Sequence, residues 1–198
     1  MGNQNFTTFK PYTMIKRLTC LFILALLFCM ASAQQPAQTI KAGSKIDYKF
    51  FLYGQTVPVT LTIKSMTGDV MLDWYIRGGI GSYLIPAAAF ENGKRLNFIQ
   101  PAQNTEIKLG ENETFALISK SAFRTLQKDK KLVYNNTTYV LKENEPVYQA
   151  GSLQLDVLHV VGQEEAGDLW ILNDPEFPLI CQFSNNPLGI NFSMIAIK

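Results

Sequence analysis

The chain has 198 residues, with 18 lysine and arginine residues against 16 aspartate and glutamate residues, and one histidine. A formal net charge of +2 excludes the strongly basic face that nucleic-acid binding requires. Three of the basic residues and none of the acidic ones lie in residues 1–33, so the remainder is close to neutral. We expect no nucleic-acid partner.

The N-terminal segment has the pattern of a secretory signal peptide. Lys16 and Arg17 precede an apolar run of about ten residues, Leu21 to Met30, and three small residues ending at Ala33 follow it. The run is shorter than the ~20 residues that span a bilayer. We predict cleavage after Ala33, export to the periplasm or the extracellular space, and no transmembrane span in the product. Met14 directly precedes this pattern, which favours it over Met1 as the translation start.

Cysteine use is consistent with one domain without disulfides. Cys20 and Cys29 lie in the predicted leader, and Cys181 alone cannot form an intrachain disulfide. Residues 34–44 are polar and predict a short tether. Residues 45–198 are long enough to bury a core and predict a single β domain.

The domain begins with three segments in which apolar and polar residues alternate. This period of two is typical of half-buried strands, and glycine-containing turns separate the segments. Pro58 lacks the N–H of a ladder hydrogen bond, which predicts a sheet edge or a bulge at that point. The segments, predicted to form an antiparallel meander, are residues 45–53, 56–64 and 69–77.

A glycine-rich stretch, Arg-Gly-Gly-Ile-Gly at residues 77–81, follows the meander. It lacks the further residues that a phosphate-binding loop needs, so it predicts a turn or a corner kink. Residues 83–90 are predicted to be extended, and Asn92-Gly93 has the pattern of a tight hairpin turn. The chain is predicted to return in strands at residues 96–99, 107–109 and 114–118.

One helix is predicted, over residues 119–130. Ser119 or Ser121 can cap its start. The basic residues recur at four-residue intervals on the side opposite the apolar stripe. A solvated helix face explains them, and contact with an anionic lipid surface or an acidic partner is the functional alternative. These residues are Lys120, Arg124 and Lys128.

Strands fill the remainder of the chain. One long strand is predicted over residues 153–161, with His159 on the same face as Val157 and Val161. Asn173-Asp174-Pro175 predicts a turn. The other strands are predicted at residues 132–134, 137–141, 169–172, 179–183 and 190–197. The predicted fold is therefore all-β with one short α-helix, in which an antiparallel, strongly curved sheet forms a half-barrel or open barrel.

The sequence does not favour catalysis or metal binding. His159 is the only histidine, it lies in the middle of a strand, and no G-x-S-x-G nucleophile motif is present. Cys181 lies in an apolar run, where burial makes a thiol inert. No cluster suits zinc or calcium. We predict no catalytic residue, metal or cofactor, and a hydrolase using His159 is the least favoured alternative.

Several strands carry apolar residues on both faces, as Phe50 and Phe51 do. A packed core explains this pattern, and an apolar cavity on a concave sheet face also explains it. If a cavity exists, aromatic residues and the histidine are the candidates for its walls and mouth. The candidate ligand-binding residues are Trp74, Tyr83, His159, Trp170 and Phe177.

Five stretches resemble a group of exported hypothetical proteins of Gram-negative bacteria. The layout of meander, helix and late hairpins is similar to periplasmic domains with a half-barrel sheet like that of the lipoprotein carriers. The resemblance implies a fold and a compartment, and the lipid binding of the carriers is an analogy. The stretches are residues 81–86, 114–123, 134–139, 169–175 and 187–190.

The sequence thus gives one leading functional hypothesis, an exported envelope protein that binds an apolar ligand or lipid without catalysis. The main alternative is a structural or interaction module whose apolar outer strand residues dock on an envelope partner.

Overall fold

A computed structural model describes residues 2, 40–100, 102–143 and 147–198. The predicted leader, its cleavage site and part of the predicted tether lie outside these residues. Within the rest of the tether, Ile40 is buried and the backbone N–H of Gly43 donates to the carbonyl of Ile63 at 2.7 Å. Residues 40–44 therefore pack against the β domain.

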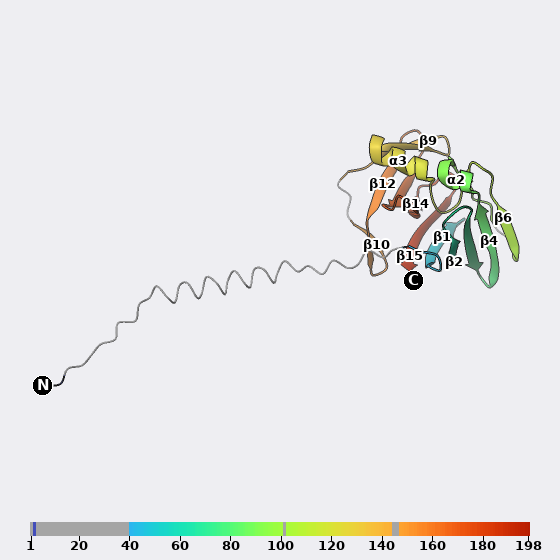
Figure 1. Ribbon diagram of the computed structural model, residues 1–198, viewed down its shortest axis with the longest axis horizontal. Helices are drawn as coiled ribbons and strands as arrows, with labels where there is room; N and C mark the ends of the chain where they lie inside the picture. The colour runs from blue at the N-terminus through green and yellow to red at the C-terminus, as the bar shows by residue number, and fades with distance from the viewer. Residues whose placement is uncertain (1, 3–39, 101, 144–146) are drawn as a thin grey trace. The chain divides into compact units, whose positions relative to one another are not determined.

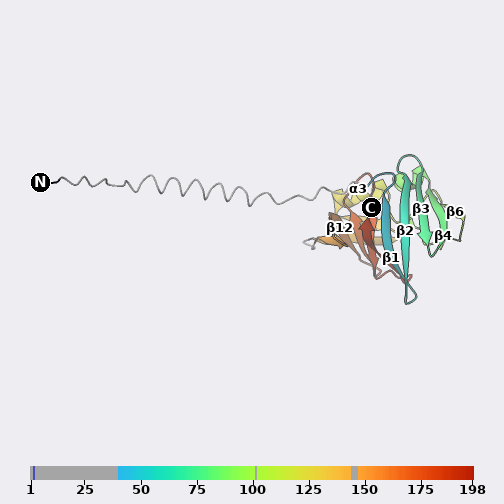
Figure 2. The same cartoon turned by 90° about the horizontal axis from the view of Figure 1, so that it is seen from below.

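Most of the described chain forms one large sheet, with the strand order β6-β4-β3-β2-β1-β15-β14-β13-β12-β9-β8. Figure 2 shows the half of this sheet that runs from β1 through β2, β3 and β4 to β6. Because β6 and β8 stand at opposite ends of the order, the sheet is open. The strands are β1 (Lys45–Leu52), β2 (Gln55–Ser65), β3 (Val70–Ile76), β4 (Gly79–Ile85), β6 (Thr105–Lys108), β8 (Lys131–Tyr134), β9 (Thr137–Leu141), β12 (Val157–Gly162), β13 (Asp168–Leu172), β14 (Ile180–Ser184) and β15 (Ile190–Ile197).

The predicted meander is confirmed, since β1, β2 and β3 pair antiparallel in succession. Pro58 lies in the part of β2 that pairs with β1 but extends past the last residue paired with β3. At Pro58 one side of β2 therefore has no neighbouring strand, so the missing N–H removes no hydrogen bond to β3. The sequence analysis predicted such a local sheet edge or a bulge. The predicted turn at the glycine-rich stretch is also confirmed, because Arg77 and Gly78 link β3 to β4 with φ of 49° and 85°.

The prediction of a wholly antiparallel sheet is wrong at one edge. Strand β6 pairs with β4 in parallel, so the sheet is mixed. Parallel neighbours need a crossover connection rather than a tight turn. Here the connection includes a helix, α2 (Ala87–Asn92), that the sequence analysis did not predict.

Asn92-Gly93 consequently ends a helix and is not the predicted hairpin turn. Gly93 donates its backbone N–H to the carbonyl of Ala89 at 2.7 Å. A Cβ at Gly93 would lie 2.6 Å from that same oxygen, so the close approach requires glycine. The three alanines at the start of α2 have the highest helix propensity of any residue, which explains why residues 87–90 are not extended as predicted.

Two small sheets flank the large one. Strand β5 (Arg95–Leu96) pairs in parallel with β7 (Glu113–Thr114), and β10 (Tyr148–Ala150) pairs antiparallel with β11 (Leu153–Leu155). The predicted long strand at residues 153–161 is therefore wrong: β11 and β12 are separate strands in different sheets.

The longer helix, α3 (Lys120–Asp129), confirms the predicted helix. Ser119 is its N-cap, and the Ser119 hydroxyl accepts a hydrogen bond from the backbone N–H of Ala122 at 3.3 Å. The helix ends at Lys130, which takes the left-handed conformation with φ 57°. Phe123 and Leu126 are fully buried. With α2 the domain has two described helices instead of one, and Figure 1 shows them close together at one end of the domain.

The side of the sheet that packs on the core is here called the inner face. It is defined by the buried residues Tyr48 on β1, Leu61 on β2, Leu72 on β3 and Ile85 on β4. The alternating residues of the same strands point to the outer face. In the part of the chain that the structure describes, no helix is both long enough and apolar enough to cross a membrane.

Candidate functional site

A pocket of about 310 Å³ lies on the inner face of β1 to β4. Its volume is at the lower end of the range of small-molecule sites, about 300–1,000 Å³. Most of its wall is apolar. The apolar residues that line it are Phe50, Leu52, Val57, Val59, Trp74, Ile76, Tyr83, Phe98, Ile99, Phe115 and Ile190, with Tyr53, Arg77 and Gln100 completing the lining.

Trp74 contributes an unsatisfied hydrogen-bond donor to this wall. The residue is 3% exposed, and its indole Nε1 has no hydrogen-bond partner among the described residues. Burying a donor without an acceptor costs about 1–3 kcal/mol. Because Nε1 itself has almost no accessible surface, the part of Trp74 that a ligand in the pocket would meet is the apolar ring.

The position of the indole depends on the neighbouring strand. Trp74 on β3 is paired in register with Gly81 on β4. A Cβ at Gly81 would lie 2.5 Å from the indole Cζ2 and 2.3 Å from the backbone oxygen of Thr105. The absence of a side chain at Gly81 therefore lets the indole approach β4 closely.

Tyr83 and Phe115 form the second aromatic element of the pocket. Their rings stack with centroids 4.0 Å apart and planes 20° apart. The Tyr83 hydroxyl donates to the carbonyl of Ile99 at 2.9 Å. Burial raises the pKa of Tyr83 well above its usual value, so the hydroxyl stays a donor.

That hydrogen bond ties residues 97–100 to the pocket. Asn97 holds the same segment, since its Oδ1 accepts from the backbone N–H of Ile99 at 2.8 Å and its Nδ2 donates to Glu113 at 3.1 Å. The segment carries Phe98 and Ile99 to the pocket rim. It has no regular structure beyond β5, contrary to the strand predicted at residues 96–99.

The rim combines exposed apolar side chains with a single cation. Tyr53 is 90% exposed and Ile99 is 57% exposed. Arg77, on the turn between β3 and β4, lines the pocket, and its Nη2 is 3.5 Å from Oε1 of Gln55. No carboxylate is found among the described residues that line the pocket.

The structure brings two of the five predicted ligand-binding residues together. Trp74 and Tyr83 both line the pocket, whereas His159, Trp170 and Phe177 do not. The sequence analysis missed the others. Arg77 was assigned to the end of a strand and to the turn after it, and Phe98 and Phe115 were assigned to strands, whereas both lie in irregular chain in the structure.

His159 and Trp170 lie on the outer face, because Leu169 and Ile171, which alternate with Trp170, are fully buried in the core. Their rings stack with centroids 4.0 Å apart, and His159 Nε2 is 3.2 Å from Oδ1 of Asp168. His159 is 5% exposed. These contacts indicate that His159 helps to hold β12 against β13.

Phe177 lies in the core rather than at a pocket mouth. It is fully buried, and its ring centroid is 5.7 Å from that of Phe90 on α2. It follows the turn that the sequence predicted at residues 173–175, where Asp174 Oδ1 accepts from the backbone N–H of Glu176 at 2.9 Å.

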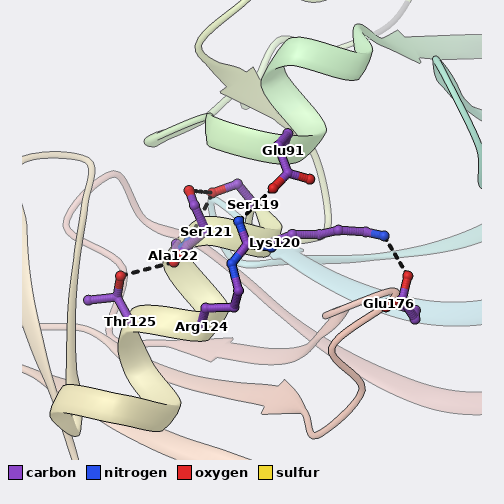
Figure 3. Close-up of polar contacts among 8 residues, drawn as sticks. All are labelled: Glu91, Ser119, Lys120, Ser121, Ala122, Arg124, Thr125 and Glu176. Atoms are coloured by element: carbon purple, nitrogen blue, oxygen red, sulfur yellow. Dashed lines mark hydrogen bonds and ion pairs between the residues drawn. The ribbon is translucent and has the colours of Figure 1, made fainter.

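The basic residues of α3 are mostly paired within the chain (Figure 3). Lys120 Nζ is 2.6 Å from Oε2 of Glu176, and Arg124 Nη2 is 2.5 Å from Oε1 of Glu91 on α2. The Lys120 hydrogen bond lowers the pKa of Glu176. These pairs connect α3 to α2 and to the turn before β14. Binding of an anionic surface by Lys120, Arg124 and Lys128 stays a prediction.

A second pocket, of about 480 Å³, shares Phe98 with the first and has a polar lining that includes Arg95 and Glu165. Much of its polar lining holds the chain itself. Asn135 Oδ1 accepts from the backbone N–H of Leu96 at 2.7 Å, and Asn186 Nδ2 donates to the carbonyl of Ile190 at 2.8 Å. The inner-face pocket is therefore the stronger candidate site.

The described residues contain no group of three or more histidine, cysteine, aspartate or glutamate side chains placed to hold a metal ion. Cys181 is fully buried, and burial raises the pKa of its thiol, as the sequence analysis expected of an inert cysteine.

Comparison with known proteins gives no significant match to a family model, to a curated protein or to a solved structure. Function is therefore inferred from the residues of the site.

Proposed function

We propose that this domain is a non-enzymatic binding protein that holds an apolar ligand in the inner-face pocket. The observation that carries the proposal is the pocket itself, whose wall consists mainly of aromatic and aliphatic side chains, with Trp74 and Tyr83 among them. Apolar walls with a few placed polar groups are typical of small-molecule sites.

The driving force is burial of apolar surface. Each methylene group that moves from water into the pocket contributes about 0.8 kcal/mol. The small volume favours a single alkyl chain or a compact ring system over a two-chain lipid. The exposed Tyr53 and Ile99 at the rim give such a ligand an apolar entry.

The proposal includes two features that the sequence predicts, export of the protein and a half-barrel curvature of the sheet. Export would place the domain in the periplasm or outside the cell, and a half-barrel curvature of the sheet would make the inner face concave. A carrier or sensor of a sparingly water-soluble compound suits that setting.

Calorimetric titration with 1-decanol tests the proposal without assuming a head group. Val57 is half-buried on β2 and lines the pocket, so Val57→Phe should fill part of the cavity and weaken decanol binding by at least tenfold. Val133→Phe makes the same change at a residue 56% exposed on β8 and should leave binding unchanged. Absence of decanol binding to the wild-type protein, or equal losses in both variants, would overturn the proposal.

The alternative of an interaction module rests on a different observation. Tyr75 on β3 and Ile80 on β4 are paired in register on the outer face and are 54% and 57% exposed. Exposed apolar side chains that lie side by side are candidates for a contact with another protein. Sedimentation of the wild type and of a Tyr75→Ser, Ile80→Ser double variant tests for self-association: a concentration-dependent dimer lost in the variant would support this alternative.

A further inference from the structure

We infer that the ligand of the inner-face pocket is a single-chain amphiphile with an anionic head, and that Arg77 binds the head. The inference rests on the proposed function and adds the charge of the ligand to it. The pocket offers hydrogen-bond donors and a positive charge, and its described lining contains no carboxylate.

The donor that a ligand in the pocket can reach is the Arg77 guanidinium, because Trp74 Nε1 is buried with almost no accessible surface. Arg77 stands at the rim with a guanidinium whose one hydrogen bond in the described structure, to Gln55, is long at 3.5 Å. A guanidinium offers five donors, so most of them are available to an anion.

Of the other polar residues that line the pocket, Tyr83 and Tyr53 do not compete with Arg77 for an anion, and Gln100 carries no charge. The Tyr83 hydroxyl is committed to the carbonyl of Ile99. Tyr53 is 90% exposed at the rim. An alkyl chain in the apolar part of the pocket would therefore bring its polar end towards Arg77, where a charged oxygen gains a charge-assisted hydrogen bond.

The test compares ligands that share one alkyl chain: decanoate, 1-decanol and decylammonium, each titrated at neutral pH. Decanoate should bind about tenfold more tightly than decanol, and decylammonium more weakly than either. Arg77→Gln should remove the advantage of decanoate, so that decanoate loses at least tenfold more affinity than decanol does. Lys49→Gln removes the same charge from an exposed residue of β1 and should preserve the advantage.

The outcomes separate the two proposals. If decanol and decanoate bind equally to the wild type, or if Arg77→Gln weakens both equally, the anionic head is refuted while the apolar pocket stands. If none of the three binds, the proposed function falls as well. Decyl phosphate separates two sources of an anionic head: tighter binding of the carboxylate indicates a free fatty acid, and tighter binding of the phosphate indicates a lipid head group.

Discussion

The indole of Trp74 lies over Gly81 on the adjacent strand so closely that a Cβ at Gly81 would come within 2.5 Å of the indole Cζ2. The two residues are paired in register across β3 and β4. One wall of the pocket thus depends on the absence of a side chain at a single position. This relationship makes the site sensitive to a substitution that adds one carbon atom.

We expect Gly81→Ala to destabilise the domain by about 1–3 kcal/mol, the usual cost of overpacking, and to weaken decanol binding. The added methyl group would meet the backbone oxygen of Thr105 as well as the indole, and a backbone atom cannot move aside. Urea unfolding measures the first effect and calorimetry the second.

Gly79→Ala is the matched control. Its closest neighbour would be Cγ of Gln103, a flexible side chain that can shift. Its effect on stability should be clearly smaller. Equal stability of the Gly81→Ala variant and the wild type would show that the contact between Trp74 and Gly81 is not tight in solution.

We expect the buried hydroxyl of Tyr134 to stabilise the fold through its hydrogen bonds with Thr114 and Ser119. Its hydroxyl lies 2.7 Å from Oγ1 of Thr114 and accepts from the backbone N–H of Ser119 at 3.2 Å. Burial raises the pKa of Tyr134 to about 12, so it is neutral at ordinary pH. Tyr134→Phe should cost about 1–3 kcal/mol in urea unfolding because it leaves buried polar groups unpaired. Tyr53→Phe, at a residue 90% exposed, should change stability little, and equal effects of the two variants would contradict this role.

Cys181 should resist thiol reagents in the native protein. It is fully buried, and burial raises the pKa of its thiol, so little thiolate is available to react. In protein that begins at Gln34, and so lacks Cys20 and Cys29, a colorimetric thiol assay should show slow reaction in buffer and rapid reaction in concentrated urea. Rapid modification in buffer would place the residue at an accessible position instead.

Ionised Asp47 should stabilise the folded domain, and protonation of its carboxylate at low pH should remove this stabilisation. Burial alone would raise its pKa, but hydrogen bonds from Lys198 and Thr60 outweigh burial and lower the pKa below the usual value. A lowered folded-state pKa gives stability that is present above about pH 4, the unfolded pKa, and that is lost as pH falls through the folded-state pKa. The unfolding midpoint measured from pH 6 to pH 2 should therefore fall less steeply in Asp47→Asn.

Thr60→Val provides the intermediate case. It keeps the carboxylate and the Lys198 contact but removes the hydrogen bond that Thr60 donates to Asp47 Oδ1 at 2.7 Å. Its acid dependence should lie between those of the wild type and Asp47→Asn. Identical pH profiles for all three proteins would show that Asp47 has no altered pKa.

The strands with a clear period of two could be predicted from the sequence. The predicted bounds of β9 and β15 match those of the structure, because β-branched and apolar residues alternate there between turn residues. Helix α3 was predicted from its cap and apolar stripe. These features are local, so the sequence contains them.

The wrong predictions concern segments whose conformation depends on contacts with distant parts of the chain. Asn92-Gly93 has the pattern of a hairpin turn, but the preceding alanines form α2, and the chain then reaches β6 in parallel with β4. Likewise, the β10–β11 hairpin contacts the large sheet through Tyr148, whose hydroxyl donates to the carbonyl of Cys181 at 3.1 Å. Such packing places apolar residues on both faces of the sheet, and periodicity cannot then distinguish the two faces.

The same ambiguity limited the prediction of the site. Trp74 and Tyr83 were predicted as ligand-binding residues and do line one pocket. His159 and Trp170 were predicted with them, but their strands turn those side chains to the outer face. Alternation shows which residues share a face of a strand, and only the packed structure shows which face is inside.

The most direct test of an apolar ligand site at Trp74 is a fluorescence titration of the Trp170→Phe variant with decanoate. The chain has two tryptophans, so the emission of this variant comes from Trp74 alone. We predict a saturable change in Trp74 emission with one decanoate per chain, which addition of Val57→Phe strongly weakens. Unchanged emission of the folded variant at saturating decanoate would contradict the account.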